Sequence, residues 1–348
     1  MEERKENGAN GAAAMPLQAS LALTLRCNLN CPFCYERAWR AAPVAELSAE
    51  SWLKVLRELD DMSVLRVRLS GGEPLLSPAF LPLVREMPHT RMRFRVITNG
   101  TLMEEAIARE LAESRRCEVV QISLDGPEAA HDAIRGRGNF ARAMAAITRL
   151  HGAGVPVKVN TVLNRRNLAE LPRMLEAWEK LPITGYTLSA QTIPDEAGTA
   201  LSLDDVARAA CDILACAADH PKLRCKGFPF NLIDMLEKPD DDAPEQGGCL
   251  LSKIQINIGP DGAVWACPQL PGIVGGRVGE TPLREIWSRS PELVAFRAKS
   301  RRDVSLDDPA CASCRWRGNC RRWCPSKAER PLCYRQLAEK MEALGWRP

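Results

Sequence analysis

Short β-branched segments alternate with longer helical segments along the first two thirds of the chain, and this alternation restricts the fold more than any other feature. The strand candidates are residues 19–25, 64–70, 93–99, 118–124, 155–163 and 184–190. The helix candidates, with apolar residues at helical spacing, are 48–62, 80–87, 101–114, 139–154, 167–181 and 202–219. Such alternation is typical of βα units on a parallel sheet. Six units are fewer than the eight of a closed barrel, so we predict an α/β fold built as a partial (β/α)6 TIM-type barrel.

The character of the sequence changes after about residue 238. Residues 237–248, "EKPDDDAPEQGG", form an acidic linker that contains Pro and Gly. A hairpin-like segment at 254–267 and one further helix near 281–299 follow, and then a Cys-dense, Arg-rich tail. We predict a disordered tail at 1–16, the barrel at 17–238, a metal-dependent module at 239–335 and a C-terminal helix or tail at 336–348.

Composition excludes several classes of protein. The chain of 348 residues is 45% hydrophobic and 26% charged, which is typical of a globular protein. Its net charge of +3 is too small to indicate a nucleic-acid or anionic-membrane partner. No apolar run has the length of a membrane span, and residues 1–16 lack the apolar core of a signal peptide. We therefore expect a cytoplasmic protein.

The 14 cysteines are the unusual part of the composition. Disulfide frameworks belong mostly to small secreted scaffolds, whereas a large chain without an export signal is expected in a reducing compartment. Clustered cysteines there bind metal more often than one another. The cysteines are therefore interpreted as candidate metal ligands.

Three of them, Cys27, Cys31 and Cys34, lie within eight residues in "TLRCNLNCPFCYERAW". A structural zinc site usually has four protein ligands, a c-type haem attachment needs a His directly after the Cys pair, and a thioredoxin-like motif needs only two thiols. A four-iron cluster held by three thiolates would keep one iron open for a substrate or cofactor. A zinc site or a chance cluster is the alternative for the triplet taken alone.

The spacing C-x3-C-x2-C, directly after the first strand candidate, resembles that of the radical S-adenosylmethionine (radical SAM) family. This resemblance implies a 4Fe–4S cluster on Cys27, Cys31 and Cys34 whose open iron binds S-adenosyl-L-methionine. In that family reductive cleavage of the cofactor produces a 5′-deoxyadenosyl radical, which takes a hydrogen atom from the substrate. The resemblance also implies that Phe33 lies beside the adenine.

Three further strand-end segments match the family in the same order. They are "SGGEP" (70–74), "TNG" (98–100) and "ISLDGPEAAHDAIRG" (122–136). By resemblance, the first meets the methionine amino group, and Ser123 and Arg135 hold the methionine carboxylate. Glycine permits the close backbone approach that an ammonium group needs, and an Arg fork suits a carboxylate. An ordinary strand-end turn and a solvent-facing Arg are the alternatives. The implied S-adenosylmethionine-binding residues are Phe33, Gly71, Gly72, Glu73, Pro74, Asn99, Ser123 and Arg135.

A second set of cysteines occupies the last third of the chain. Its members are Cys249, Cys267, Cys311, Cys314, Cys320, Cys324 and Cys333. Seven cysteines alone could bind zinc, but these spacings, with Gly262 between the first two, resemble the SPASM extension of radical SAM enzymes that modify peptides and proteins. The resemblance implies two auxiliary 4Fe–4S clusters, and therefore three clusters in the chain.

The two auxiliary clusters have different implied ligands. Cys311, Cys314, Cys320 and Cys333 correspond to the ligands of the outer cluster. Cys249, Cys267 and Cys324 correspond to those of the inner cluster, which again gives three thiolates. Some relatives supply a fourth Cys near the position of Ala243. We expect either that Cys225 fills this place or that the inner cluster has an open iron, and slightly favour the open iron.

The remaining candidate residues have simpler explanations. We expect Cys117, Cys211 and Cys216 to be small buried hydrophobic residues, as Cys225 would be if it is no ligand. His131 is expected in a capping or core role more than in proton transfer. The Arg-rich segment "RWRGNCRRW" at 315–323 would offset the negative charge of thiolate-bound clusters.

Several functions compete. We predict a peptide-modifying enzyme that forms an oxidative cross-link, a thioether or a carbon–carbon bond, with an auxiliary cluster accepting the remaining electron. The second hypothesis is formylglycine formation in a sulfatase, and Pro268 stands where relatives of that kind have an Asp. A small-molecule radical dehydrogenase is the third, and a zinc-stabilised binding protein is the non-enzyme alternative.

The partners follow from the predicted activity. We expect a ribosomally synthesised precursor peptide, a reductant such as flavodoxin or ferredoxin, and neither nucleic acid nor membrane. About twenty residues precede the first strand candidate, which is too few for a leader-recognition domain. We therefore expect a separate leader-binding protein, or recognition by the barrel itself.

Overall fold

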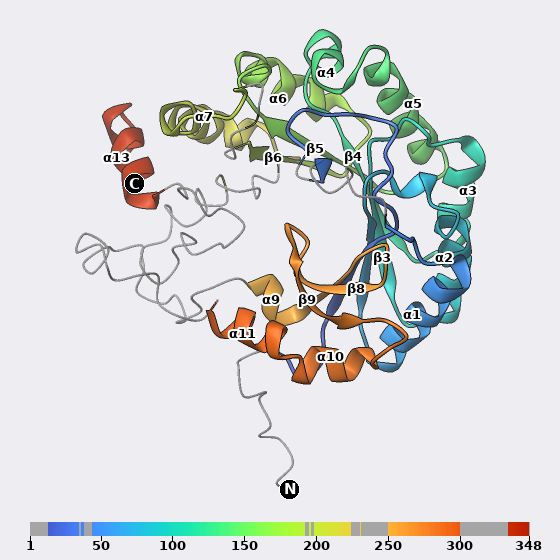
Figure 1. Cartoon of the computed structure of the whole chain (residues 1–348). Helices are drawn as coiled ribbons and strands as arrows, with labels where there is room; N and C mark the ends of the chain where they lie inside the picture. The colour runs from blue at the N-terminus through green and yellow to red at the C-terminus, as the bar shows by residue number, and fades with distance from the viewer. Residues whose placement is uncertain are drawn as a thin grey trace, which may run out of the picture.

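A curved sheet with helices on its outer face forms most of the molecule (Figure 1). The computed structural model describes residues 13–34, 36–37, 44–191, 195, 198–223, 230, 250–299 and 333–347. The strands are β1 (Gln18–Ala22), β2 (Arg66–Ser70), β3 (Arg93–Thr98), β4 (Cys117–Ser123), β5 (Val157–Leu163), β6 (Gly185–Ala190), β7 (Gln255–Ile258), β8 (Ala263–Cys267) and β9 (Leu270–Arg277).

The described chain also contains helices, and those up to residue 216 cover the convex side of the sheet (Figure 1). They are α1 (Ala49–Asp61), α2 (Phe80–Glu86), α3 (Glu105–Glu113), α4 (Glu128–Arg135), α5 (Asn139–Gly152), α6 (Leu171–Lys180), α7 (Leu203–Cys216), α9 (Leu250–Ile254), α10 (Leu283–Arg289), α11 (Pro291–Lys299) and α13 (Tyr334–Ala343). Among the described residues, no helix combines the length and the apolar character that crossing a bilayer requires.

The strands of the described part form one sheet in the order β6-β5-β4-β3-β2-β1-β7-β8-β9. Strands β1 to β6 are parallel to their neighbours, as the alternating pattern predicts. This confirms the α/β partial barrel. Strand β7 also pairs in parallel with β1, and β8 and β9 continue from it as antiparallel strands. The C-terminal part of the chain therefore extends the same sheet.

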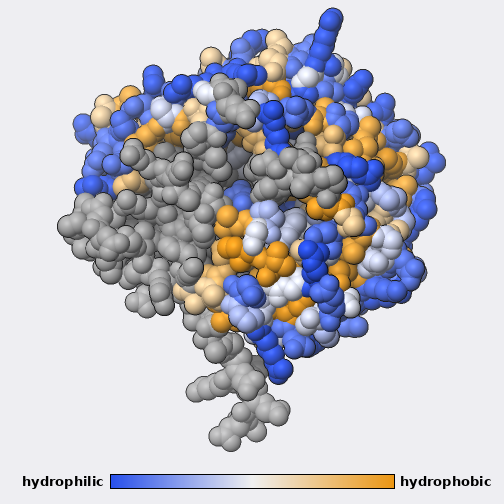
Figure 2. Space-filling view, viewed as in Figure 1, coloured by the Kyte–Doolittle hydropathy of each residue, from blue (hydrophilic) through white to orange (hydrophobic). Residues whose placement is uncertain are grey.

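Helix α1 shows how the outer layer forms. Ser48 caps its N-terminus by accepting a hydrogen bond from the Ser51 N–H. Its buried residues Trp52, Val55, Leu56 and Leu59 repeat at helical spacing and face the sheet. The opposite faces of the outer helices make the largely hydrophilic rim in Figure 2.

Local sequence chemistry explains where the structure departs from the predicted elements. The helix expected near 281–299 is two helices, α10 and α11, because Pro291 disfavours a helical conformation at Ser290, whose ψ is 122°. Strand β9 is not predicted, since its three glycines weaken strand propensity. The helix expected at 167–181 begins at Leu171 as α6, because Pro172 is tolerated in the first turn of a helix but not in its interior.

One hydrophobic core joins the two parts of the chain. Ile256 and Ile258 of β7 belong to the same buried cluster as Leu21 of β1 and Leu69 of β2. Helix α13 packs on α7, where its Met341 is fully buried. The linker at 237–248 and the predicted boundary at 238/239 lie outside the described residues.

Candidate active site

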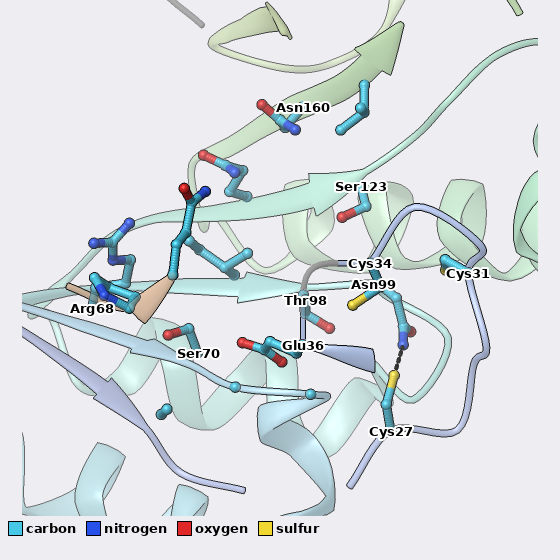
Figure 3. Close-up of a pocket in the computed structure, with 18 of the residues that line it drawn as sticks. Cys27, Cys31, Cys34, Glu36, Arg68, Ser70, Thr98, Asn99, Ser123 and Asn160 are labelled. Atoms are coloured by element: carbon cyan, nitrogen blue, oxygen red, sulfur yellow. Dashed lines mark hydrogen bonds between the residues drawn. The ribbon is translucent and has the colours of Figure 1, made fainter. Parts of the chain in front are cut away.

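A cavity of about 480 Å³ opens at the carboxyl ends of the parallel strands (Figure 3). This is within the size range of small-molecule sites, and such sites lie at this edge of barrel-like sheets. Its wall brings together distant segments that the sequence singles out. Cys27, Cys31, Cys34, Phe33, Gly71, Gly72, Asn99, Ser123 and Arg135 all line it. Glu73 and Pro74 are buried and are not part of this wall.

The cysteine triplet lies in the loop that follows β1. The Leu29 N–H donates a hydrogen bond of 3.4 Å to Cys27 Sγ. Asn99, at the end of β3, donates from Nδ2 to the same sulfur at 3.9 Å, the dashed line in Figure 3. Within the loop, the Cys34 N–H donates to the Cys31 carbonyl oxygen at 3.2 Å. The adjacent strand end thus helps to hold the cysteine loop.

These residues fit an iron–sulfur cluster. Three thiols line one cavity, and N–H groups and a guanidinium lie at hydrogen-bonding distance from two of the sulfurs. Such donors stabilise thiolate-bound clusters and tune their potentials. Within the described part of the chain, no three His, Cys, Asp or Glu side chains are placed to share a single metal ion. The argument for a cluster at this place therefore rests on the three thiols and on the hydrogen-bond donors around them.

The glycine-rich turn after β2 is pinned to the loop of the triplet. The Gly72 N–H donates to the Thr24 carbonyl oxygen, and the Glu73 N–H donates to that of Arg26, both at 2.8 Å. Gly71 has a φ of +125°, and a Cβ added at Gly72 would lie 2.3 Å from the Arg26 carbonyl oxygen. Only glycine allows the backbone of this turn to lie so close to the backbone of the cysteine loop.

The Glu73 carboxylate braces two strand ends. It accepts hydrogen bonds from Thr98 Oγ1 at 2.7 Å, from the Asn99 N–H at 2.8 Å and from the Leu75 N–H at 3.3 Å. Burial raises the pKa of this carboxyl, while those hydrogen bonds oppose the rise. Glu73 therefore does not line the cavity in this structure, and its implied contact with the methionine amino group stays a prediction.

Arg135 is the buried cation of the site. Its Nε donates to Asp125 Oδ2 at 2.5 Å, its NH1 lies 3.8 Å from Cys31 Sγ, and its guanidinium is 5.7 Å from the centre of the Phe33 ring. Burial lowers the pKa of Arg135, but Asp125 and Cys31 outweigh this effect and the pKa is raised. Burial likewise raises the pKa of the Cys31 thiol, against the influence of Arg135.

Asp125 is a candidate site residue that the sequence reasoning missed. Its side chain is fully buried and accepts both from Arg135 and from the Val162 N–H, at 2.8 Å. It follows Ser123 by two positions in the strand-end segment, so a carboxylate ten residues before Arg135 was the available signal. Polar residues at alternate positions of the strands were a second unused signal. Those that line the cavity are Ser20, Arg68, Ser70, Thr98, Gln121, Ser123, Asn160, Ser189 and Asn257.

The second set of cysteines is described only in part. Cys267 ends β8, and its neighbours Trp265, Pro268 and Gln269 line the cavity. Cys333 lies directly before α13. Cys225, Cys249, Cys311, Cys314, Cys320 and Cys324, with Ala243, lie outside the described residues.

The other singled-out side chains have structural roles. His131 is a buried residue of α4, and its Nδ1 accepts a hydrogen bond of 3.1 Å from the Asp125 N–H, so of the expected capping or core role the core role is confirmed. Burial lowers the pKa of His131 to about 4. Cys117, Cys211 and Cys216 pack against the core but remain partly exposed.

Comparison with known proteins identifies the family. The model of the radical SAM superfamily matches residues 21–177, and that of the SPASM iron–sulfur cluster-binding domain matches residues 249–320. The chain is a radical SAM enzyme with a SPASM domain. Its cofactors are accordingly S-adenosylmethionine and iron–sulfur clusters, in agreement with the sequence prediction.

Relatives of this radical SAM enzyme span most of its length. A PqqA peptide cyclase from Granulibacter bethesdensis is 28% identical over 320 residues, which cover 88% of this chain and 82% of the relative. An AdoMet-dependent heme synthase from Methanosarcina barkeri is 27% identical, covering 85% of this chain and 90% of the relative.

Solved structures share the fold at lower identity. Streptococcus suis SuiB bound to S-adenosylmethionine is 18% identical with a TM-score of 0.74, covering 91% of this chain and 73% of SuiB. The AdoMet-bound structure of anSMEcpe is 18% identical with a TM-score of 0.75, covering 94% of this chain and 96% of that protein.

Proposed function

We propose that this radical SAM enzyme modifies a ribosomally made peptide by oxidative cross-linking, through a thioether or a carbon–carbon bond. The observation that carries the proposal is the continuity of the cavity at the carboxyl ends of the strands. This cavity extends from the cysteine triplet to Trp265, Pro268 and Gln269, the residues around Cys267. A side chain bound there would lie between the triplet and a SPASM cysteine. Relatives named as peptide cyclases support a peptide substrate.

We further propose the cofactor ligands that the resemblance implies. Cys27, Cys31 and Cys34 would hold the cluster that binds S-adenosylmethionine, and the seven SPASM cysteines two auxiliary clusters. The proposed division is a barrel at 17–238 and an auxiliary-cluster module at 239–335. When bound, these groups would supply the deoxyadenosyl radical and an acceptor for the electron that a new bond releases.

The residues of the chain would position and shield the reactants. Ser123 and Arg135 line the cavity and would hold the methionine carboxylate, with the Arg135 guanidinium oriented by its hydrogen bond to Asp125. Gly71 and Gly72 also line the cavity and would meet the methionine amino group with their backbone carbonyls. Phe33 lines the cavity with its ring centre 5.7 Å from the Arg135 guanidinium and would lie beside the adenine.

Formylglycine formation and haem synthesis are the alternatives. Pro268 lines the cavity at the position where sulfatase-maturing relatives have an Asp, and proline has no proton-accepting group. The heme synthase among the relatives is a reason to test a tetrapyrrole as well. The peptide remains favoured because several of the relatives are peptide cyclases.

The proposal includes two proteins that would act with the enzyme. A separate leader-binding protein would deliver the precursor, and a flavodoxin or ferredoxin would supply the electron. Pull-down of small proteins encoded near the gene would identify the first. Unaided tight binding of a full leader peptide would show that no carrier is needed.

The direct experiment is anaerobic incubation of the cluster-loaded enzyme with precursor peptides encoded beside its gene, S-adenosylmethionine and a strong reductant. Mass spectrometry should show a loss of two hydrogens with an internal cross-link. Conversion of Cys to an aldehyde would support the sulfatase hypothesis instead. The variant with Ala at Cys27, Cys31 and Cys34 is the control and should form no 5′-deoxyadenosine.

A further inference from the structure

A row of four side chains crosses the inner face of the barrel on neighbouring strands. Ala22 of β1 is in register with Ser70 of β2, and Ile97 of β3 is in register with Gln121 of β4. The parallel pairing of β2 with β3 joins the two pairs into one row. All four residues line the cavity. The row is therefore part of the surface that a bound substrate would meet.

Gln121 lies deeper in the cavity than the proposed cofactor-binding residue of its own strand. Ser123, which would hold the methionine carboxylate, is two positions further along β4 and in register with Asn160 of β5 (Figure 3). Two residues of a strand point to the same face and span about 7 Å. A group bound at Gln121 would therefore lie below the cofactor, on the side away from the cysteine loop.

The side-chain amide of Gln121 has no hydrogen-bond partner among the described residues. The other polar group of the row is already engaged, because Ser70 Oγ donates to the Leu21 carbonyl oxygen at 3.4 Å. Ala22 and Ile97 have no polar side-chain atoms. Gln121 is thus the member of the row whose donor and acceptor are both available to a ligand in the cavity.

The chemistry of this side chain selects the ligand. A carboxamide offers N–H donors and a carbonyl acceptor, and it carries no charge. A peptide group offers the same two functions, so the two groups can bind each other through both. The apolar neighbours Ala22 and Ile97 disfavour a charged group at this depth, because its hydration would be lost. A neutral amide therefore fits the row best.

We propose that Gln121 is a specificity-determining residue that binds a main-chain amide of the substrate peptide. The inference rests on the proposed function and adds the group by which the peptide is held below the cofactor. Gln121 Oε1 would accept from a peptide N–H, and Nε2 would donate to a peptide carbonyl oxygen. A main chain fixed in this way would determine which neighbouring side chain faces the deoxyadenosyl radical.

The test compares two small probes of nearly the same shape. N-acetylalanine N-methylamide has two peptide groups, and the methyl ester of O-acetyllactic acid has oxygen in place of both N–H groups. Their binding to the cluster-loaded enzyme with S-adenosylmethionine is measured anaerobically by calorimetry. We expect the amide to bind about tenfold more tightly, because the ester leaves Gln121 Oε1 without a donor. Gln121→Leu should abolish this preference, whereas Gln121→Glu should retain it because a carboxylate still accepts the N–H.

Gln18 provides a matched control. It is a half-buried glutamine of β1, but it does not line the cavity. Gln18→Leu should therefore keep the preference for the amide probe. Equal affinity for the two probes, a preference that survives Gln121→Leu, or no binding of either probe at about 50 mM would overturn the inference.

Two further measurements separate this inference from the proposed function. If precursor peptides are cross-linked with the same kcat and KM by the wild-type enzyme and Gln121→Leu, the function stands and the amide site does not. Propionamide, a primary amide, represents the side chain of Asn or Gln. Gln121-dependent binding of propionamide without binding of the blocked alanine would overturn the main-chain source of the amide. An unchanged S-adenosylmethionine affinity shows that Gln121→Leu is folded.

Discussion

At the scale of single residues, the pair of Asp125 and Arg135 determines how the site can act. Both side chains are almost completely withdrawn from solvent, with exposures of 0% and 9%. A buried guanidinium that lacks its carboxylate partner destabilises the folded state, because its charge is no longer compensated. The burial of Arg135 therefore requires Asp125. Asp125 is a positioning residue, because it aims Arg135 at the Cys31 thiol and the Phe33 ring.

Asp125→Asn tests this role. We expect S-adenosylmethionine to bind about tenfold more weakly and the protein to lose about 3 kcal/mol of stability, since a buried charge loses its partner. Equilibrium binding and denaturant unfolding measure these effects, and iron content reports on the clusters. Glu110→Gln, which breaks the exposed pair with Arg85, is the control and should change little. Unaltered cofactor affinity in Asp125→Asn would remove the residue from the site.

His131 gives a pH dependence. Its pKa is lowered to about 4 by burial, so the folded protein keeps it neutral while the unfolded chain protonates it near pH 6.5. Its contribution to stability is complete above about pH 6.5 and decreases as the pH falls toward 4. Between pH 7 and pH 5 we expect a loss of about 2 kcal/mol from this group. His131→Gln, whose side chain does not titrate, should lose correspondingly less in the same urea titrations.

At the scale of elements, the turn after β2 connects two loops of the site. The glycines of this turn lie against the backbone at Thr24 and Arg26, immediately before the triplet. Any side chain there would push the cysteine loop away from the strand. The turn therefore sets the position of the cluster ligands as well as of the cofactor.

Gly72→Ala tests this connection. The added Cβ would collide with the Arg26 carbonyl oxygen, so we expect a clear loss of stability, about 1–3 kcal/mol, and weaker cofactor binding. Gly152→Ala is the matched control, because an added Cβ there meets no atom within 4 Å, and it should stabilise α5 slightly. Thermal unfolding and S-adenosylmethionine binding measure both. An unperturbed Gly72→Ala variant would contradict the close packing of the turn.

At the scale of the whole molecule, α13 returns the end of the chain to the barrel. Leu337, Ala338 and Met341 of this helix are buried, and Lys340 pairs with Asp204 of α7 at 2.5 Å. Cys333 directly precedes the helix. Packing of α13 on α7 therefore fixes the position of Cys333, one of the proposed ligands of the outer cluster.

Met341→Ala should weaken this anchor. Truncation of a buried side chain of this size costs about 2–5 kcal/mol. We expect part of the auxiliary iron to be lost while S-adenosylmethionine cleavage continues, because the triplet lies elsewhere. Iron analysis and assay of 5′-deoxyadenosine measure the two effects. Lys340→Ala, which removes a surface ion pair, should retain full iron content. If Met341→Ala contained as much iron as the wild-type protein, the packing of α13 would not be needed to hold the auxiliary clusters.

Prediction from sequence was most successful where one local signal dominated. Runs such as "RFRVITN" gave β3 directly, and the triplet and glycine turn led to the cavity. Prediction failed where tertiary contacts decide. Strand β9 exists because Gly275 and Gly276 let Leu293 and Ile286 approach its backbone, which no local propensity reveals. The role of Asp125 likewise depends on tertiary contacts, because its buried carboxylate accepts hydrogen bonds from Arg135 and from the Val162 N–H of β5.

The pairing of β7 with β1 has a consequence for how this protein can be divided. In a barrel prepared without the region after residue 250, β1 would present a row of unsatisfied backbone N–H and C=O groups to solvent. Such an exposed strand edge pairs with strands of other molecules, which leads to aggregation. By pairing with β1, strand β7 covers this edge of the parallel sheet. We therefore expect the barrel and the strands after residue 250 to unfold together, as one cooperative unit.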